Sequence, residues 1–384
     1  MARRFIPARL RLLLRRAAVW GGSSLALGIA VLVIALLIPG CTAGYVTRQS
    51  ITHLHVLAAR QPVERMLDED AVPEEWRAKI AIIQDARAFG VETLDLPASD
   101  LYRTISLVHP DPNWIVTASP RDALRPVTWW FPAAGRVAYR GYYSRAGAGR
   151  FADRLRRRRL DVLVRPSDAF STLGWFADPI RPAMMDRSEA SLVDLVLHEA
   201  THRVVYFKGQ TDFNESFASF VGETGTLLYL AARHGAGCDL CRRTAAAYAD
   251  EETFGAFIAD LVTRLEDLYS RPISSEEKIR RRQAIFDAAR QRSRTLPWQG
   301  HGHDGFAHAS LDNAVILSLR RYGKDRDLFS RVLSACDGDL ARSIHTVRNL
   351  GWSDLSRRQK RSGDPFTLLR DRLATADKCS SPAA

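Results

Sequence analysis

The chain has 384 residues, 46% of them hydrophobic, and a formal net charge of +12. Aromatic and branched aliphatic residues occur throughout, which excludes a chain that is disordered over its whole length. Half of the net charge comes from six arginines that precede Ala17, and no Asp or Glu occurs before Cys41. Because this charge is concentrated in a leader segment, we expect no nucleic-acid partner.

Residues 1–40 have the pattern of an export leader. The arginines are followed by an apolar stretch and then by Pro39-Gly40-Cys41, and a basic start, an apolar centre and a small residue at the cut site are typical of a secretory signal. A cysteine at this position resembles the bacterial lipoprotein signal, in which Cys41 becomes lipidated. The alternative is an uncleaved membrane anchor, since the stretch is close to the ~20 residues that span a bilayer. Both interpretations predict that the chain after Cys41 lies outside the cytoplasm.

Residues 41–185 are predicted to form N-terminal helices and a small sheet. Apolar residues recur every three to six positions between Ile51 and Phe89, which indicates helix. Pro73 interrupts this pattern and predicts a break between two helices.

The sheet is predicted from a change of residue composition in the middle of the chain. Residues 127–131 and 136–143 are rich in β-branched and aromatic side chains and are separated by a Pro-Ala-Ala-Gly segment, which predicts a hairpin or two neighbouring strands. Residues 161–164 predict another short strand, after a helix at about 144–159.

Residues 186–234 are predicted to form a pair of helices. Asp186 and Glu189 have the spacing of a capping box at the start of the first helix. Gly209 can end that helix, and Asp212 can begin the second.

The first helix carries the segment His198-Glu199-Ala200-Thr201-His202. Its two histidines are four residues apart, so both imidazoles project from one face and can bind one metal ion. Glu199 is adjacent and can serve as the general base on an attacking water, as in the H-E-x-x-H pattern. The helix is apolar on both sides, so a buried and unpaired His-Glu-His set would be costly without a metal. We therefore predict one Zn²⁺ per chain.

A catalytic zinc ion needs a third protein ligand and an open position. On the second helix, Glu215 shares a face with three small residues, Ala218, Ser219 and Gly222, which allow the two helices to approach closely. The competing ligand, Glu223, faces about 80° away from Glu215 at 100° per residue. We therefore predict Glu215 as the third ligand.

Residues 235–384 are predicted to be mostly helical. Cys238 and Cys241 form a C-x-x-C pair without a second such pair, which favours a local disulfide in an oxidising compartment. Cys336 and Cys379 are either paired or free.

Two further segments have open interpretations. His301, His303 and His308 form either a second metal site or, as we prefer, part of a Gly-rich loop beside the active cleft. Residues 171–176, which precede the first helix of the pair, form either a packed loop or a wall of the substrate cleft.

The order of H-E-x-x-H, a short turn and Asn-Glu-x-Phe-Ala at residues 214–218 resembles the glutamate zincins. A closer resemblance is to a bacterial lipoprotein family described as predicted zinc aminopeptidases. It is carried by Gly40-Cys41 and by residues 139–143, 169–176, 198–218 and, more weakly, 311–314.

The resemblance implies that His198, His202 and Glu215 bind zinc and that Glu199 is the general base. Members of the family often have Tyr where this chain has Phe170, so a different oxyanion donor is expected here. The candidates are Tyr206, Tyr229, Tyr142 and Tyr143. Asp212 is either a partner that orients a ligand histidine or a surface cap.

Together these features predict a mainly α protein with a small β-sheet (α+β). Its zincin-like helix pair follows a short sheet and precedes a helical C-terminal region. The predicted function is that of a membrane-anchored zinc metallopeptidase of the bacterial cell envelope, facing the periplasm, with a peptide or protein as substrate. The family resemblance implies an aminopeptidase. The alternatives are an envelope zinc endopeptidase, favoured by the lack of a Gly-x-Met-Glu-Asn-like segment that would bind a free amine, and a non-catalytic metal-binding lipoprotein.

Overall fold

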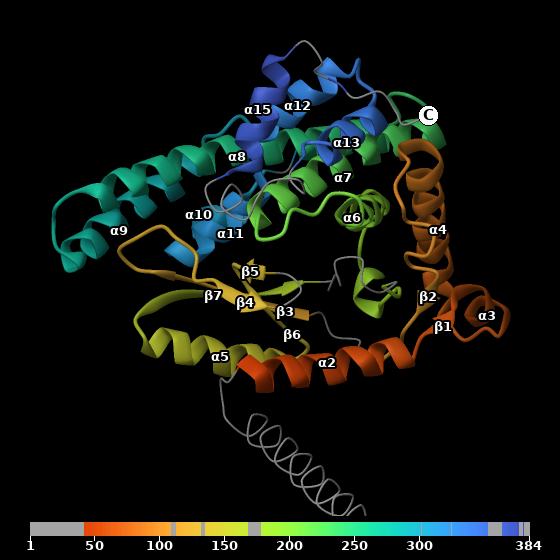
Figure 1. Cartoon of the computed structure of the whole chain (residues 1–384), viewed down its shortest axis with the longest axis horizontal. Helices are drawn as coiled ribbons and strands as arrows, with labels where there is room; N and C mark the ends of the chain where they lie inside the picture. Colours follow the sequence, from red (N-terminus) through yellow and green to blue (C-terminus); the bar gives the residue numbers. More distant parts are fainter. Residues whose placement is uncertain are drawn as a thin grey trace, which may run out of the picture. The chain divides into compact units, whose positions relative to one another are not determined.

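A computed structural model describes residues 42–108, 113–131, 135–167, 178–300, 302–323, 325–351, 363–375 and 379 (Figure 1). The chain divides into two compact units, Met1–Ala58 and Ala59–Ala384. The predicted leader with Cys41, the predicted cleft segment 171–176 with Phe170, and His301 lie outside the described residues. None of the described helices combines the length and the apolar character that a membrane span requires.

The first unit contributes helix α2, Thr42–Ala58. The helix has no acidic residue, and its apolar side chains Ile51 and Leu54 are exposed. It begins nine residues before the predicted start at Ile51.

The second unit begins with strand β1 (Gln61–Pro62) and helices α3 (Val63–Asp68) and α4 (Glu74–Leu94). Pro73 is the N-cap of α4, which confirms the predicted break between helices. Proline suits this position because it has no backbone N–H to lose at a helix start. The buried face of α4 packs against the first helix of the central pair.

A three-stranded antiparallel sheet has the strand order β6-β3-β7, formed by Arg140–Tyr142, Asn113–Pro120 and Leu160–Ser167. The register of β3 on β7 runs from Asn113↔Ser167 to Pro120↔Leu160. Helix α5 (Arg145–Arg157) covers one side of this sheet and α11 (Asn313–Gly323) the other (Figure 1). The sequence predicted β7 and α5 but missed β3, the central strand.

The predicted hairpin is present as β4 (Trp129–Phe131) and β5 (Gly135–Val137). The single strand predicted at 136–143 is, however, divided between two sheets. Its first part, β5, pairs with β4, whereas its second part, β6, pairs with β3. A further short strand, β2 (Thr104–Ile105), pairs with β1. The small antiparallel sheets among predominantly helical elements confirm the α+β class.

A short 3₁₀ helix, η1 (Pro182–Met184), leads to the central pair α6 (Glu189–His202) and α7 (Thr211–His234). The pair was predicted, but its caps differ. Ser188 and not Asp186 begins α6, and its Oγ accepts a hydrogen bond from the Ser191 N–H. Asp212 does not cap α7, whose N-cap residue Gln210 makes no side-chain capping bond.

Helices α6 and α7 lie side by side (Figure 1), and two glycines of α7 bring them close together. A Cβ atom on Gly222 would lie 2.3 Å from Oδ1 of Asp194, and one on Gly225 would lie 2.7 Å from a methyl group of Leu197. Both distances are below those of real Cβ contacts, so a larger residue at either position would displace the side chain that faces it. The small-residue face predicted for the second helix therefore contributes to the packing of the pair.

The C-terminal region is helical, as predicted. Its helices are α8 (Asp239–Ser270), α9 (Ser275–Ser293), α10 (Asp304–His308), α11 (Asn313–Gly323), α12 (Arg326–Ala335), α13 (Leu340–Arg348) and α15 (Pro365–Ala374). One hydrophobic core surrounds α6 and α7, and a second lies among α8, α9 and α11. His303 packs in this region, stacked on Phe254 at 4.0 Å between ring centroids.

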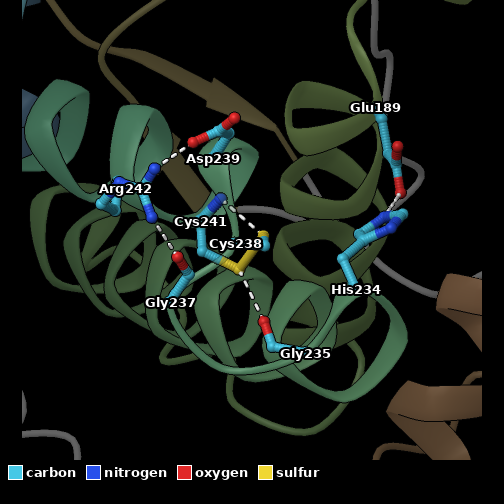
Figure 2. The surroundings of a disulfide bond; sticks show 8 residues. All are labelled: Glu189, His234, Gly235, Gly237, Cys238, Asp239, Cys241 and Arg242. Carbon is cyan, nitrogen blue, oxygen red and sulfur yellow. Dashed lines mark hydrogen bonds and ion pairs between the residues drawn. A yellow bond between two sulfur atoms is a disulfide. The ribbon is translucent and has the colours of Figure 1, made fainter.

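Cys238 and Cys241 form a disulfide, and so do Cys336 and Cys379. Figure 2 shows the first of them at the turn between α7 and α8, where the Cys241 N–H donates to Sγ of Cys238. His234, at the end of α7, lies 2.7 Å from Glu189 at the start of α6. The local disulfide follows the sequence prediction, whereas the pairing of Cys336 with Cys379 was left open there.

Candidate metal centre

Helix α6 presents His198 and His202 one turn apart near its C-terminal end. Their ring centroids are 4.8 Å apart, and the ring planes are nearly perpendicular, at 83°. The two Nε2 atoms face each other at 3.2 Å. Both histidines therefore direct the same ring nitrogen toward one point, as the spacing of four residues predicts.

Helix α7 brings Glu215 to the same point. Its Oε2 lies 3.6 Å from Nε2 of His198 and 3.9 Å from Nε2 of His202. In a tetrahedral zinc site with bonds of about 2.1 Å, ligand atoms are about 3.4 Å apart. The three donor atoms therefore have nearly the spacing that one zinc ion requires. Among the described residues, these three form the group of His, Cys, Asp or Glu side chains that could hold a metal ion.

Buried polar atoms without partners surround this point. His202 is 5% exposed and Glu199 is 7% exposed. Nδ1 of His202 and Oε2 of Glu199 have no hydrogen-bond partner within the described parts of the chain. Such atoms destabilise a fold by a few kcal/mol unless another function retains them. The donor set therefore fits a metal ion and a reacting water better than it fits a purely structural role.

The two histidines differ in their affinity for a proton. Burial lowers the pKa of His198, but its contact with Glu215 and the charge of Glu199 outweigh this effect and raise the pKa to about 9. Burial lowers the pKa of His202. A positive charge is thus stabilised beside Glu215, in the position that a cation would occupy.

Asn214, which precedes Glu215, fixes the turn between the two helices. Its side-chain oxygen accepts from the Phe207 N–H at 2.8 Å, and its amide donates to the Phe207 carbonyl at 2.9 Å. Both bonds are buried, so they hold the start of α7 against the chain that leaves α6. The sequence motif was interpreted only through Glu215, and this contribution of Asn214 was missed.

Comparison with known proteins identifies the family of the chain. Residues 44–361 match the model of the family described as "Putative aminopeptidase". The chain belongs to this family. No curated protein and no solved structure matched the chain significantly. The match includes both helices of the aminopeptidase-family centre and thus all three candidate ligands.

In this aminopeptidase-family member, the structure separates the two candidate glutamates. Glu223 forms a two-point ion pair with Arg326, in which Nη1 donates to Oε1 at 2.7 Å. Burial raises the pKa of Glu223, and Arg326 opposes that rise. Glu215 therefore faces the histidines, whereas the charge of Glu223 is engaged by an arginine.

The candidate oxyanion donors occupy different places. Burial and the charge of Glu215 raise the pKa of Tyr206, so its hydroxyl stays protonated near the centre. The prediction for Tyr229 needs correction, because its hydroxyl donates to Asp85 at 2.7 Å. It also follows Glu215 by 14 residues on α7, which corresponds to about 21 Å along the helix. Tyr142 packs against Phe151, with the ring centroids 5.7 Å apart and the ring planes tilted by 37°.

Two other predictions concern polar contacts near the centre. Oδ2 of Asp212 lies 3.8 Å from Nη2 of Arg320, and no hydrogen bond joins Asp212 to a ligand histidine. Tyr143 lies beneath the guanidinium of Arg181, at 5.8 Å. Asp212 is therefore neither a helix cap nor a direct partner of His202.

Sequence reasoning missed two residues near the centre. Tyr102 is 3% exposed and has a left-handed backbone with φ of 55°. Burial and the nearby charge of Glu199 raise its pKa well above the usual value. Asp194 lies one turn before His198, and burial raises its pKa to about 7. The spacing of four residues was a usable signal for Asp194, whereas no local pattern links Tyr102 to the helix pair.

Proposed function

We propose that this protein is a zinc-dependent peptidase, and specifically an aminopeptidase in keeping with its family. The observation that carries the proposal is the convergence of His198, His202 and Glu215 beside the buried Glu199. These residues would hold one Zn²⁺ per chain. When bound, zinc would polarise the scissile carbonyl and acidify the attacking water.

Glu199 has the position that a general base needs. It follows the first histidine directly, and its Oε2 is buried and makes no hydrogen bond to a described residue. It would take a proton from the water that attacks the carbonyl carbon and deliver a proton to the departing amine nitrogen. The water oxygen bonds to the carbonyl carbon first, and the C–N bond breaks when the amine nitrogen receives its proton. This arrangement favours a catalytic protein over one that only binds metal.

The negative charge that develops on the carbonyl oxygen needs a hydrogen-bond donor in addition to the metal. Tyr206 is the candidate donor in the described chain, because its protonated hydroxyl lies in the field of Glu215.

We further propose that the protein is a lipoprotein of the bacterial cell envelope, anchored through Cys41 and facing the periplasm. The leader pattern before Cys41 supports this location. The two disulfides support it as well, because disulfides persist mainly in oxidising compartments. An uncleaved leader helix is the alternative anchor.

The decisive experiment compares Glu199→Gln with the wild-type protein. Because the substitution removes the proton acceptor but no ligand, we expect the variant to bind one zinc per chain and to hydrolyse peptides about 10²–10⁴-fold more slowly. Glu189→Gln, on the same helix but paired with His234 at its far end, is the matched control and should remain active. Absence of zinc in the wild type, or full activity of Glu199→Gln, would contradict the proposal.

A second measurement tests the substrate preference. Peptides with a free N-terminal amine and the same peptides with a blocked amine should be supplied to the wild-type enzyme. An aminopeptidase should release single residues from the free peptides and leave the blocked ones intact. Internal cleavage of blocked peptides would replace the aminopeptidase with an envelope endopeptidase on the same site.

A further inference from the structure

A half-buried carboxylate, Asp194, lies one helical turn before the first histidine of the centre. Asp194 precedes His198 by four residues on α6, so both side chains project from one face of the helix. The carboxylate rests directly on α7 at Gly222, where an added Cβ would meet Asp194 Oδ1 at 2.3 Å. Because Gly222 has no side chain, the carboxylate of Asp194 has room to lie against α7.

Oδ1 of Asp194 has no hydrogen-bond partner among the described residues, although it is buried. The polar groups around it are engaged elsewhere. Arg326 is paired with Glu223, and the Thr226 hydroxyl donates to the Gly222 carbonyl at 2.7 Å. A buried carboxylate without a partner is costly, so its retention needs a reason.

Tyr248, another polar neighbour of Asp194, is hydrogen-bonded to Thr226. His198 is the neighbour on the same helix that can supply the missing partner. Its Nε2 faces His202 and Glu215, so its Nδ1 is the ring nitrogen left for another group. A metal-binding histidine commonly donates its second N–H to a carboxylate, which fixes the tautomer and orients the ring.

We propose that Asp194 is a positioning residue that accepts the Nδ1–H of His198 when the metal is bound and so holds Nε2 toward the metal. Gly222 provides the space that the carboxylate needs. This inference rests on the proposed zinc site and extends it to a fourth side chain of α6 and to one glycine of α7.

Zinc affinity of the full-length protein, measured by competition with a chromophoric chelator, tests the inference. Asp194→Ala should bind zinc about 10–100-fold more weakly than the wild type. Asp194→Asn keeps an oxygen that can accept the same hydrogen bond, so it should recover most of this loss. The visible spectrum of the Co²⁺-substituted protein should shift in Asp194→Ala and remain close to the wild type in Asp194→Asn.

A pair of glycine variants separates this role from general packing. Gly222→Ala should displace the carboxylate and weaken zinc binding about as much as Asp194→Ala. Gly225→Ala is the matched control, because its methyl group would meet Leu197 and Leu94 instead. It should lower stability without a comparable loss of zinc affinity. Circular dichroism and the unfolding midpoint of the metal-free proteins would establish that each variant is folded.

The outcomes distinguish the inference from the proposed function. A wild type that binds no zinc overturns both. A wild type that binds zinc, together with folded Asp194→Ala and Gly222→Ala proteins of unchanged affinity, overturns the role of Asp194 alone. If Asp194→Ala does not fold, Asp194→Asn and Gly222→Ala decide, and equal affinity losses in Gly222→Ala and Gly225→Ala would also reject the role.

Discussion

Buried charges occur in two regions of this fold, and the regions differ in how their polar atoms are paired. In the first, Asp161 of β7 accepts two hydrogen bonds from Arg282 of α9, at 2.5 and 3.2 Å. It also accepts from the N–H of Asn313, at the start of α11. The Asn313 side chain donates to backbone carbonyls after β3 and accepts from the Tyr269 hydroxyl. We call Asp161, Arg282, Asn313 and Tyr269 the sheet–helix network.

The second region is the centre between α6 and α7, where one atom each of Glu199, His202 and Asp194 lacks a partner among the described residues. The sheet–helix network satisfies its charges internally and joins the sheet to the C-terminal helices. The centre leaves charges unsatisfied at the place where the candidate ligands converge. Both regions thus contain buried polar residues, but the four residues of the network are paired with one another, whereas the centre combines unpaired atoms with converging candidate ligands.

The largest expected effect comes from a variant that disrupts the sheet–helix network. Asp161→Ala leaves Arg282 buried without its carboxylate, so it should lower the free energy of unfolding by about 3–5 kcal/mol. Zinc affinity of the folded protein should not change. Chemical denaturation measures the first quantity and chelator competition the second. Arg280→Ala, which removes an exposed partner of Glu277, is the control and should change stability by no more than about 0.5 kcal/mol. A loss below about 1 kcal/mol in Asp161→Ala would remove the contrast between the regions.

Exchange of one glutamate at a time tests which carboxylate belongs to the centre. Glu215→Gln should weaken zinc binding by about 100-fold or more, which corresponds to about 2.7 kcal/mol. Glu223→Gln removes the charge that pairs with Arg326, so it should destabilise the fold and leave zinc affinity within a few-fold of the wild type. Titration of the apo proteins with zinc measures both. The assignment fails if Glu223→Gln loses zinc while Glu215→Gln retains it.

Zinc should stabilise the protein by binding at the centre. At a free concentration thirty times its Kd, zinc should raise the free energy of unfolding of the wild type by about 2 kcal/mol, and a chelator should reverse the gain. Asp161→Ala should show the same gain, although its free energy of unfolding without zinc is lower. His202→Ala should show none, because it lacks a ligand. Thermal unfolding with and without zinc measures all three, and a gain in His202→Ala would place the bound zinc elsewhere.

The smallest effect concerns Asn214, whose side chain is hydrogen-bonded to the backbone at the turn before the centre. Asn214→Ala removes two buried hydrogen bonds to the backbone of Phe207, so stability should fall by about 1–2 kcal/mol. Zinc affinity should fall a few-fold, because Glu215 loses the anchor that precedes it. Asp212→Ala, which removes no capping bond, should stay within about 0.5 kcal/mol of the wild type. Unaltered stability in Asn214→Ala would show that the turn is held by other contacts.

Local sequence patterns determined much of the fold and the centre of the candidate site. Helix periodicity alone put His198 and His202 on one face, because a turn of 3.6 residues is fixed by backbone geometry. Pro73 marked a helix break for an equally local reason. The hairpin of β4 and β5 followed from residue type and a short connection.

Tertiary structure decided every question about partners distant in sequence. It put Glu215 and not Glu223 beside the histidines, moved Tyr229 to Asp85, and joined Cys336 to Cys379. It also explained residues 311–314, whose Asn313 serves the sheet–helix network.

The contact between Asp194 and Gly222 also separates what the sequence determines from what the tertiary structure decides. The sequence contained both residues, but only the packing of α6 on α7 brought them together. Propensity and periodicity depend on neighbours within a few positions, whereas the choice among buried partners depends on how whole helices pack. The sequence by itself therefore determined which residues could carry the chemistry, and the packing of α6 and α7 decided which of them meet.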